Sequence, residues 1–111
     1  MLLGVHIRDT LQDADYLADK VLALRVFSDA DGRMNDPLGE REILCVSQFT
    51  LYGDVRRGNR PGWAMAAAGP VAEPLYERFC ERTGAKRGSF GADMQVELVN
   101  DGPVTLLIES R

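Results

Sequence analysis

Ser47, Gln48 and Thr50 stand at the end of an apolar run and are the first candidates for chemistry in this chain. The run covers residues 43–46, and a loop rich in arginine and glycine follows at 52–61. Polar side chains at the end of a buried strand are costly to bury unless they have partners. Loops held by a rigid scaffold often carry function. We therefore expect the floor and the rim of a site here.

Thr50 is the candidate nucleophile by residue type, but no histidine, lysine or second acid lies near it in the sequence to activate it. The single histidine, His6, is distant, so a pair of Ser47 with His6 has no motif behind it. Paired carboxylates are equally unsupported, because the acidic residues fall on helix faces or in turns. The main-chain amides of Phe49 and Thr50 remain, and one such oxyanion donor is worth roughly 10²–10³ in rate.

Arg56, Arg57 and Arg60 form a cluster of positive charge in an acidic chain. The chain carries 13 basic and 17 acidic residues, a net charge of −4, and has a pI near 4.9. This balance argues against nucleic-acid binding by bulk charge. It leaves room for local contact with RNA, and the simpler alternative is a solvated basic loop.

Length and composition indicate one ordinary globular domain over residues 1–111, with 45% hydrophobic and 27% charged residues. Cys45 and Cys80 lack metal-ligand spacing, so we expect small core residues, no metal and no cofactor. No stretch approaches the roughly 20 apolar residues that a membrane span needs, and no signal peptide is evident. The expectation is a cytoplasmic protein with no membrane contact.

Periodicity predicts two helices that support these residues. The first covers 10–24 and starts at Thr10, a good N-cap. The second covers 71–82, buries Leu75, Tyr76 and Phe79, and stops at Gly84. Predicted strands are 1–6, 25–27, 42–49, 94–99 and 103–108. The order indicates an α+β fold with a mainly antiparallel or mixed sheet.

Gly102-Pro103 stands at the turn between the last two predicted strands. Proline removes a backbone donor, so its position at the start of a strand needs a reason. A simple turn is one explanation. A cis peptide bond is another, and about 5–6% of X-Pro bonds in folded proteins are cis. The residues alone leave both open.

Several separate motifs, in order along essentially the whole chain, carry a resemblance to a known family. They are Leu2–His6, Asp13–Leu17, Ser47–Tyr52, Gly58–Pro61, Ala72–Phe79, Phe90–Met94 and Asn100–Thr105. With these motifs the chain closely resembles the D-aminoacyl-tRNA deacylases. The resemblance implies a homodimer that hydrolyses the ester joining a D-amino acid, or glycine, to the 3′ adenosine of tRNA. It therefore implies D-aminoacyl-tRNA and glycyl-tRNA as substrates and a role in proofreading.

The resemblance also assigns roles to residues. Ser47, Gln48 and Leu51 would line the site, with Met94 in the surrounding pocket. The amides of Phe49 and Thr50 would be the oxyanion donors, and the 2′-hydroxyl of the substrate would assist water. An older competing idea makes the Thr50 hydroxyl a covalent nucleophile.

Selectivity is assigned by the resemblance to Gly102-Pro103. This bond would be cis and would enter the site of the partner subunit, where its carbonyls and close fit exclude an L side chain. The arginine loop, with Arg56, Arg57 and Arg60, could contact phosphates of the acceptor end as positioning contacts.

The chain departs from the family pattern at its start. Family members usually begin with about thirty further residues, a strand and a hairpin ahead of Leu2, and without them an exposed sheet edge or an altered dimer is expected. Either the start is misassigned or the chain is shortened. The alternative hypothesis is therefore a non-catalytic dimeric or aminoacyl-RNA-binding protein.

Overall fold

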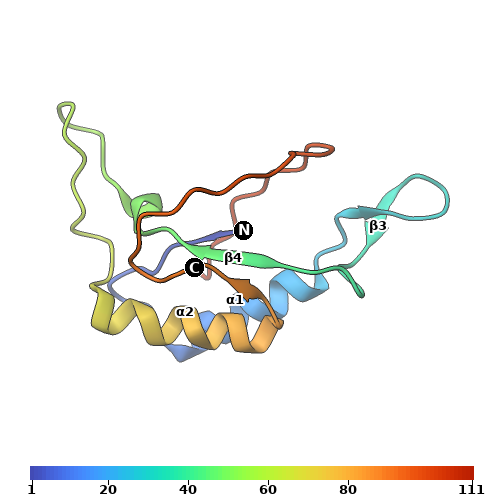
Figure 1. Ribbon diagram of the computed structural model, residues 1–111, viewed down its shortest axis with the longest axis horizontal. Coiled ribbons are helices and arrows are strands. Elements are labelled where there is room, and N and C mark those ends of the chain that lie inside the picture. The colour runs from blue at the N-terminus through green and yellow to red at the C-terminus, as the bar shows by residue number, and fades with distance from the viewer.

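The computed structural model describes residues 1–111 and contains two long helices and five short strands (Figure 1). The elements in chain order are β1 (Leu2–Leu3), α1 (Leu11–Ala23), β2 (Phe27–Ser28), β3 (Met34–Asp36), β4 (Leu44–Ser47), the 3₁₀ turn η1 (Phe49–Tyr52), α2 (Gly69–Thr83) and β5 (Lys86–Arg87). The α+β class is confirmed. No helix combines the length and the apolar character that crossing a membrane would require.

The main sheet has the order β1-β4-β5, and both strand pairs in it are parallel. The prediction of a mainly antiparallel sheet is therefore wrong. Only β2 and β3 pair antiparallel, as a separate hairpin whose turn contains Gly32 at φ 76°. Parallel pairing follows from the connections, because α1 separates β1 from β4 and α2 separates β4 from β5.

Both helices lie close to their predicted positions. At the start of α1 the Asp13 carboxylate accepts hydrogen bonds from the backbone N–H of Thr10 at 2.8 Å and from its hydroxyl at 3.0 Å. Helix α2 begins two residues earlier than predicted, because Pro70 is well placed in the first helical turn, where its missing N–H costs nothing. It ends at Gly84, which has a left-handed φ of 70°.

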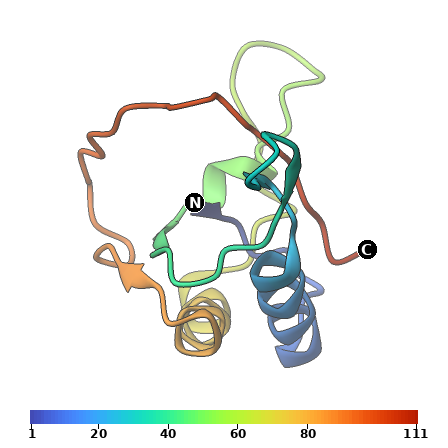
Figure 2. The ribbon, with the colours of Figure 1, turned by 90° about the vertical axis from the view of Figure 1, so that its right-hand side faces the viewer.

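The core lies between one face of the sheet and the two helices, which run side by side beneath it (Figure 2). Its members are Ala18 of α1, Ile43 and Cys45 at β4, and Tyr76, Phe79 and Cys80 of α2. Cys45 and Cys80 are free, buried thiols, as predicted. Burial raises the pKa of Cys45 to about 12, so this thiol is protonated at neutral pH.

Strand β4 is the central strand of the main sheet, paired with β1 on one side and β5 on the other. The Tyr76 hydroxyl donates a 2.7 Å hydrogen bond to the Cys45 carbonyl, which fastens α2 to the strand. The same carbonyl accepts the N–H of Gly88 at 3.3 Å. The end of β4 is therefore positioned by both α2 and the chain that follows it.

The two predicted C-terminal strands, 94–99 and 103–108, are absent. None of the 48 backbone–backbone hydrogen bonds involves residues 93–111, and Val99 and Leu107 are 91% and 81% exposed. Residues 104–110 instead form one wall of a groove of about 610 Å³, with β1 and α1 opposite. The segment arcs past the sheet without pairing with it (Figure 2). Its alternating sequence suits a strand, but no neighbouring strand lies within bonding distance.

The first strand is also shorter than predicted. Residues 1–6 were expected to be extended, yet β1 covers only Leu2–Leu3, and His6 pairs with Ala66 through an isolated antiparallel bridge. The chain leaves the sheet after Leu3 to reach α1.

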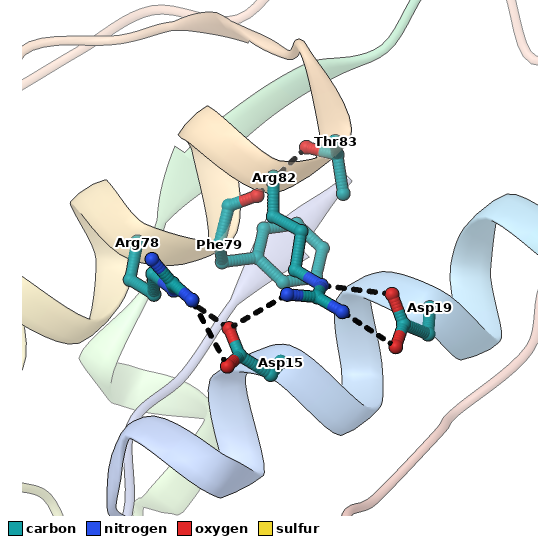
Figure 3. Close-up of polar contacts among 6 residues, drawn as sticks. All are labelled: Asp15, Asp19, Arg78, Phe79, Arg82 and Thr83. Atoms are coloured by element: carbon teal, nitrogen blue, oxygen red, sulfur yellow. Dashed lines mark hydrogen bonds and ion pairs between the residues drawn. The ribbon is translucent and has the colours of Figure 1, made fainter.

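Ion pairs connect the exposed sides of the two helices (Figure 3). Arg78 donates two hydrogen bonds to Asp15, at 2.7 and 3.1 Å. Arg82 donates two to Asp19, at 2.8 and 2.9 Å, and lies 3.7 Å from Asp15. These hydrogen bonds lower the pKa of both carboxyl groups.

Replacing both acids, Asp15→Asn and Asp19→Asn, should lower Tm at neutral pH but not in acid. A carboxyl group whose pKa falls on folding stabilises the protein above its unfolded pKa of about 3.9, and this contribution disappears as the pH falls through the folded pKa. Thermal unfolding from neutral to acidic pH should therefore show the two Tm curves converging. Glu73→Gln with Glu97→Gln is the matched control, because neither side chain has an ion-pair partner. A Tm difference that persisted at acid pH would contradict this assignment.

Candidate functional site

A pocket of about 550 Å³ opens where β4 ends. Ser47, Gln48, Phe49 and Met94, all singled out from the sequence, line it together. The volume lies within the usual range of small-molecule sites, roughly 300–1,000 Å³. The structure therefore brings residues about 45 positions apart in the chain to one cavity.

Three aromatic residues complete the wall and were not identified as site residues from the sequence. They are Trp63, Tyr76 and Phe90. Trp63 packs edge-on against Phe49, with ring centroids 5.0 Å apart and planes at 67°. Phe90 tilts against Tyr76 at 5.7 Å. The single tryptophan at the end of the glycine-rich loop was the signal that could have indicated Trp63.

Two main-chain donors near the pocket have no partner: Phe49 lines the pocket, whereas Thr50 follows it in the turn and lines none of the three pockets. Residue Phe49 begins η1, and within this turn the Leu51 N–H donates to the Gln48 carbonyl at 3.2 Å. The amides of Phe49 and Thr50 precede the first such bond and make no hydrogen bond within the protein. Both residues are exposed, and we expect these two N–H groups to be able to donate to an oxygen of a ligand.

The side chains beside these amides do not form a nucleophile-base pair. Gln48 Nε2 donates a hydrogen bond to the Thr50 hydroxyl oxygen. An amide donor takes no proton from a hydroxyl, so this contact leaves Thr50 unactivated. The His6 Nδ1 accepts the Arg8 N–H at 3.0 Å, and its ring packs edge-on against Tyr52. A pair of Ser47 with His6 does not form.

The pocket is almost free of charge. Asp93 is the single charged residue in its wall. Burial raises the pKa of Tyr76 to about 12, and its hydroxyl is already committed to the Cys45 carbonyl, so it cannot serve as a base at neutral pH. The polar groups of the wall are the Ser47 hydroxyl, the Gln48 amide and the free N–H of Phe49, with the free N–H of Thr50 next in the chain. They suit hydrogen bonding to a neutral or oxyanionic ligand.

Other predicted residues lie elsewhere. Leu51 faces the groove beside β1 and a third pocket of about 470 Å³ that also contains His6, so it does not line the same pocket as Ser47. The Gly102-Pro103 bond is cis. It lies in the segment after β5 and lines none of the three pockets, so one chain does not bring it to Ser47.

The arginine loop leaves the rim of the pocket and returns to it. Two hydrogen bonds between Asp54 and Gly62, both 2.8 Å, close its base. Arg56 bonds to the Asp54 carboxylate through Nε at 2.8 Å and through a second nitrogen at 2.7 Å. This pairing lowers the pKa of Asp54 to about 2. Arg57 and Arg60 have no ion-pair or hydrogen-bond partner for their side chains.

Comparison with known proteins identifies the family of this chain. The family model described as D-Tyr-tRNA(Tyr) deacylase matches residues 1–109. The chain belongs to the D-Tyr-tRNA(Tyr) deacylase family. The matched region contains both Ser47–Leu51 and Gly102-Pro103.

Relatives in this deacylase family cover nearly the whole chain. The D-aminoacyl-tRNA deacylase of Symbiobacterium thermophilum is 56% identical, over 99% of this chain and 78% of its own length. That of Anaeromyxobacter dehalogenans is 54% identical, over 100% of this chain and 79% of its own length. The solved structure named c-Myc DNA Unwinding Element Binding Protein is 41% identical with a TM-score of 0.86, over 95% of this chain and 76% of that chain.

Within this deacylase fold, Gly53 allows Trp63 to close the rim of the pocket. A Cβ added at Gly53 would lie 2.8 Å from Trp63 Cζ3 and 3.1 Å from the Thr50 carbonyl oxygen. Gly53→Ala should therefore displace Trp63, lower the free energy of unfolding by about 1–3 kcal/mol as overpacking does, and change the Trp63 fluorescence. Gly62→Ala is the control, since its nearest contact would be an ordinary 3.8 Å. Equal effects of the two substitutions would contradict the packing argument.

Proposed function

We propose that this protein hydrolyses the ester bond of D-aminoacyl-tRNA, releasing the free D-amino acid and the tRNA. The observation that carries the proposal is the pair of unpartnered amides of Phe49 and Thr50 beside the pocket, in a chain of the D-Tyr-tRNA(Tyr) deacylase family. We include glycyl-tRNA among the substrates, because a pocket that rejects L side chains by shape has no means of rejecting glycine.

The chemistry needs little from the side chains. Water adds to the ester carbonyl carbon, and the two amides stabilise the negative oxygen of the tetrahedral intermediate. The bond to the ribose 3′ oxygen then breaks, and that oxygen takes a proton. The 2′-hydroxyl of the substrate assists the water, which agrees with the lack of a histidine or a free base beside Thr50.

The pocket is suited to the terminal adenosine. Phe49, Trp63 and Phe90 give it aromatic walls, and unpaired bases bind to proteins by stacking on such side chains. Ser47 and Gln48 offer hydrogen bonds at its floor, and Met94 fills one side against Gly88. Leu51, on the groove side of η1, would support the turn from behind.

Selection against L substrates is proposed to involve a second copy of the chain. Gly102-Pro103 would enter the partner's pocket, and its carbonyl oxygens and close fit would exclude an L side chain. Gly102 and Pro103 line none of the three pockets of their own chain, which supports an action in trans. The proposal therefore includes a homodimer of single-domain chains.

Purified protein should release D-tyrosine from D-tyrosyl-tRNA and leave L-tyrosyl-tRNA intact. Acid-precipitable radiolabelled aminoacyl-tRNA gives the rate directly, and a full-length relative is the positive control. If the D substrate stays intact where the relative is active, the protein is not a deacylase and a non-catalytic role in dimerisation or RNA binding takes its place.

Thr50→Ala should keep substantial activity, within about tenfold of the original kcat, because the variant retains the amide and loses only an unactivated hydroxyl. Single-turnover rates with D-tyrosyl-tRNA measure this, with Tm as the control for folding. Complete loss of activity in a folded variant would instead favour the hydroxyl as a nucleophile.

A further inference from the structure

The three arginines of the loop are not equivalent. Arg56 forms a two-point ion pair with Asp54, so these two charges cancel locally. Arg57 and Arg60 have no acidic neighbour at ion-pair distance, although the chain as a whole is acidic. The loop therefore offers two free positive charges and not three.

These two charges lie at the tip of the loop. The chain reverses direction over residues 56–60, and Gly58 adopts a left-handed φ of 66° there. Arg57 and Arg60 flank this reversal and are exposed. No side chain of the protein covers Gly58, since an added Cβ would meet no atom within 4 Å. The loop projects well beyond the helices and the sheet (Figure 1).

The base of the loop is fixed to the rim of the pocket. Phe49, just before the loop, and Trp63, just after it, line the pocket and pack against each other. The Asp54–Gly62 bonds hold the two arms together above this contact. A polymer whose end occupies the pocket would therefore have this loop beside it at the rim formed by Phe49 and Trp63.

We infer that the loop 54–62 is a backbone-binding arm for the acceptor strand of tRNA, in which Arg57 and Arg60 contact phosphates and Arg56 does not. The Asp54–Arg56 ion pair instead leaves no free positive charge at that position. This inference rests on the proposed function for the nature of the polymer. It makes Arg57 and Arg60 positioning residues, which hold the RNA without reading its sequence.

The test compares three double variants that differ in which charges they remove. Arg57→Gln with Arg60→Gln removes the two free charges. Asp54→Asn with Arg56→Gln removes the internal pair at no change in net charge. Arg8→Gln with Arg33→Gln removes two exposed arginines outside the loop whose side chains have no partner.

Two measurements separate RNA binding from chemistry. The first is kcat and KM for D-tyrosyl-tRNA between about 50 and 200 mM salt, where phosphate contacts make log affinity fall linearly with log salt concentration. The second is hydrolysis of D-tyrosyl-adenosine, which carries the same ester and no phosphate.

The Arg57/Arg60 variant should show a KM about tenfold higher with tRNA, unchanged kcat, and a salt slope shallower by about 1.4–1.8, the value for two phosphates. Its hydrolysis of D-tyrosyl-adenosine should be unchanged. The other two variants should match the original protein on both substrates.

Three results would overturn the inference. If the salt slope of the Arg57/Arg60 variant equals that of the original protein, these two arginines do not contact phosphates. If the Arg8/Arg33 variant shows the same rise in KM for tRNA, the effect comes from the net charge of the protein and not from the loop. An equal loss on D-tyrosyl-adenosine would mean that the arm shapes the pocket.

Failure of the proposed function is distinguishable from failure of this inference. If the original protein cleaves neither substrate, the deacylase proposal fails. Fluorescence anisotropy with uncharged tRNA still tests the arm in that case. The Arg57/Arg60 variant should then bind more weakly than the other two, and equal affinities would contradict the inference.

Discussion

The carbonyl oxygen of Cys45 joins the strand that carries the site to two other parts of the molecule. It accepts the Tyr76 hydroxyl from α2 and the Gly88 N–H from the segment after β5, inside a core that excludes water. A buried hydrogen bond contributes only about 0.5–1.5 kcal/mol net, but leaving one of its partners unsatisfied costs about 1–3 kcal/mol. This contact positions β4 and its Ser47–Phe49 end together with the hydrogen bonds to β1, in which the Val46 and Gln48 N–H groups donate to the Met1 and Leu3 carbonyls at 3.1 and 2.8 Å.

The sequence predicted correctly those elements in which apolar residues recur at the spacing of a helix. Helix α2 shows this best, because Leu75, Tyr76 and Phe79 are buried as their spacing indicated. Local patterns cannot report on distant partners, and this explains the errors. Residues 94–108 alternate like strands, yet a strand needs a neighbour, and none lies within bonding distance. The parallel pairing likewise depends on the path of the connections, not on any one segment.

The residues of the site that lie at the end of a strand could be predicted from the sequence. Those brought to the pocket by tertiary contacts could not. Ser47, Gln48 and Phe49 were found because polar residues end an apolar run, and Met94 came from the family resemblance. Trp63 was missed because a single aromatic in a small apolar segment carries no periodic signal. The neutralisation of Arg56 by Asp54 is a matter of side-chain geometry, and residue counts treat all three arginines alike.

One wall of the pocket belongs to a segment that makes no backbone hydrogen bonds. Met94 and Val96 line it, yet from residue 93 onward the main chain makes no hydrogen bond to the rest of the protein's backbone. Ordering each residue of such a segment costs roughly 1–2 kcal/mol of conformational entropy. Side-chain contacts must offset that loss, and whatever occupies the pocket contributes to the same balance. The affinity of this site for a ligand therefore depends on how well ordered the segment 93–111 is, as well as on the groups that contact the ligand.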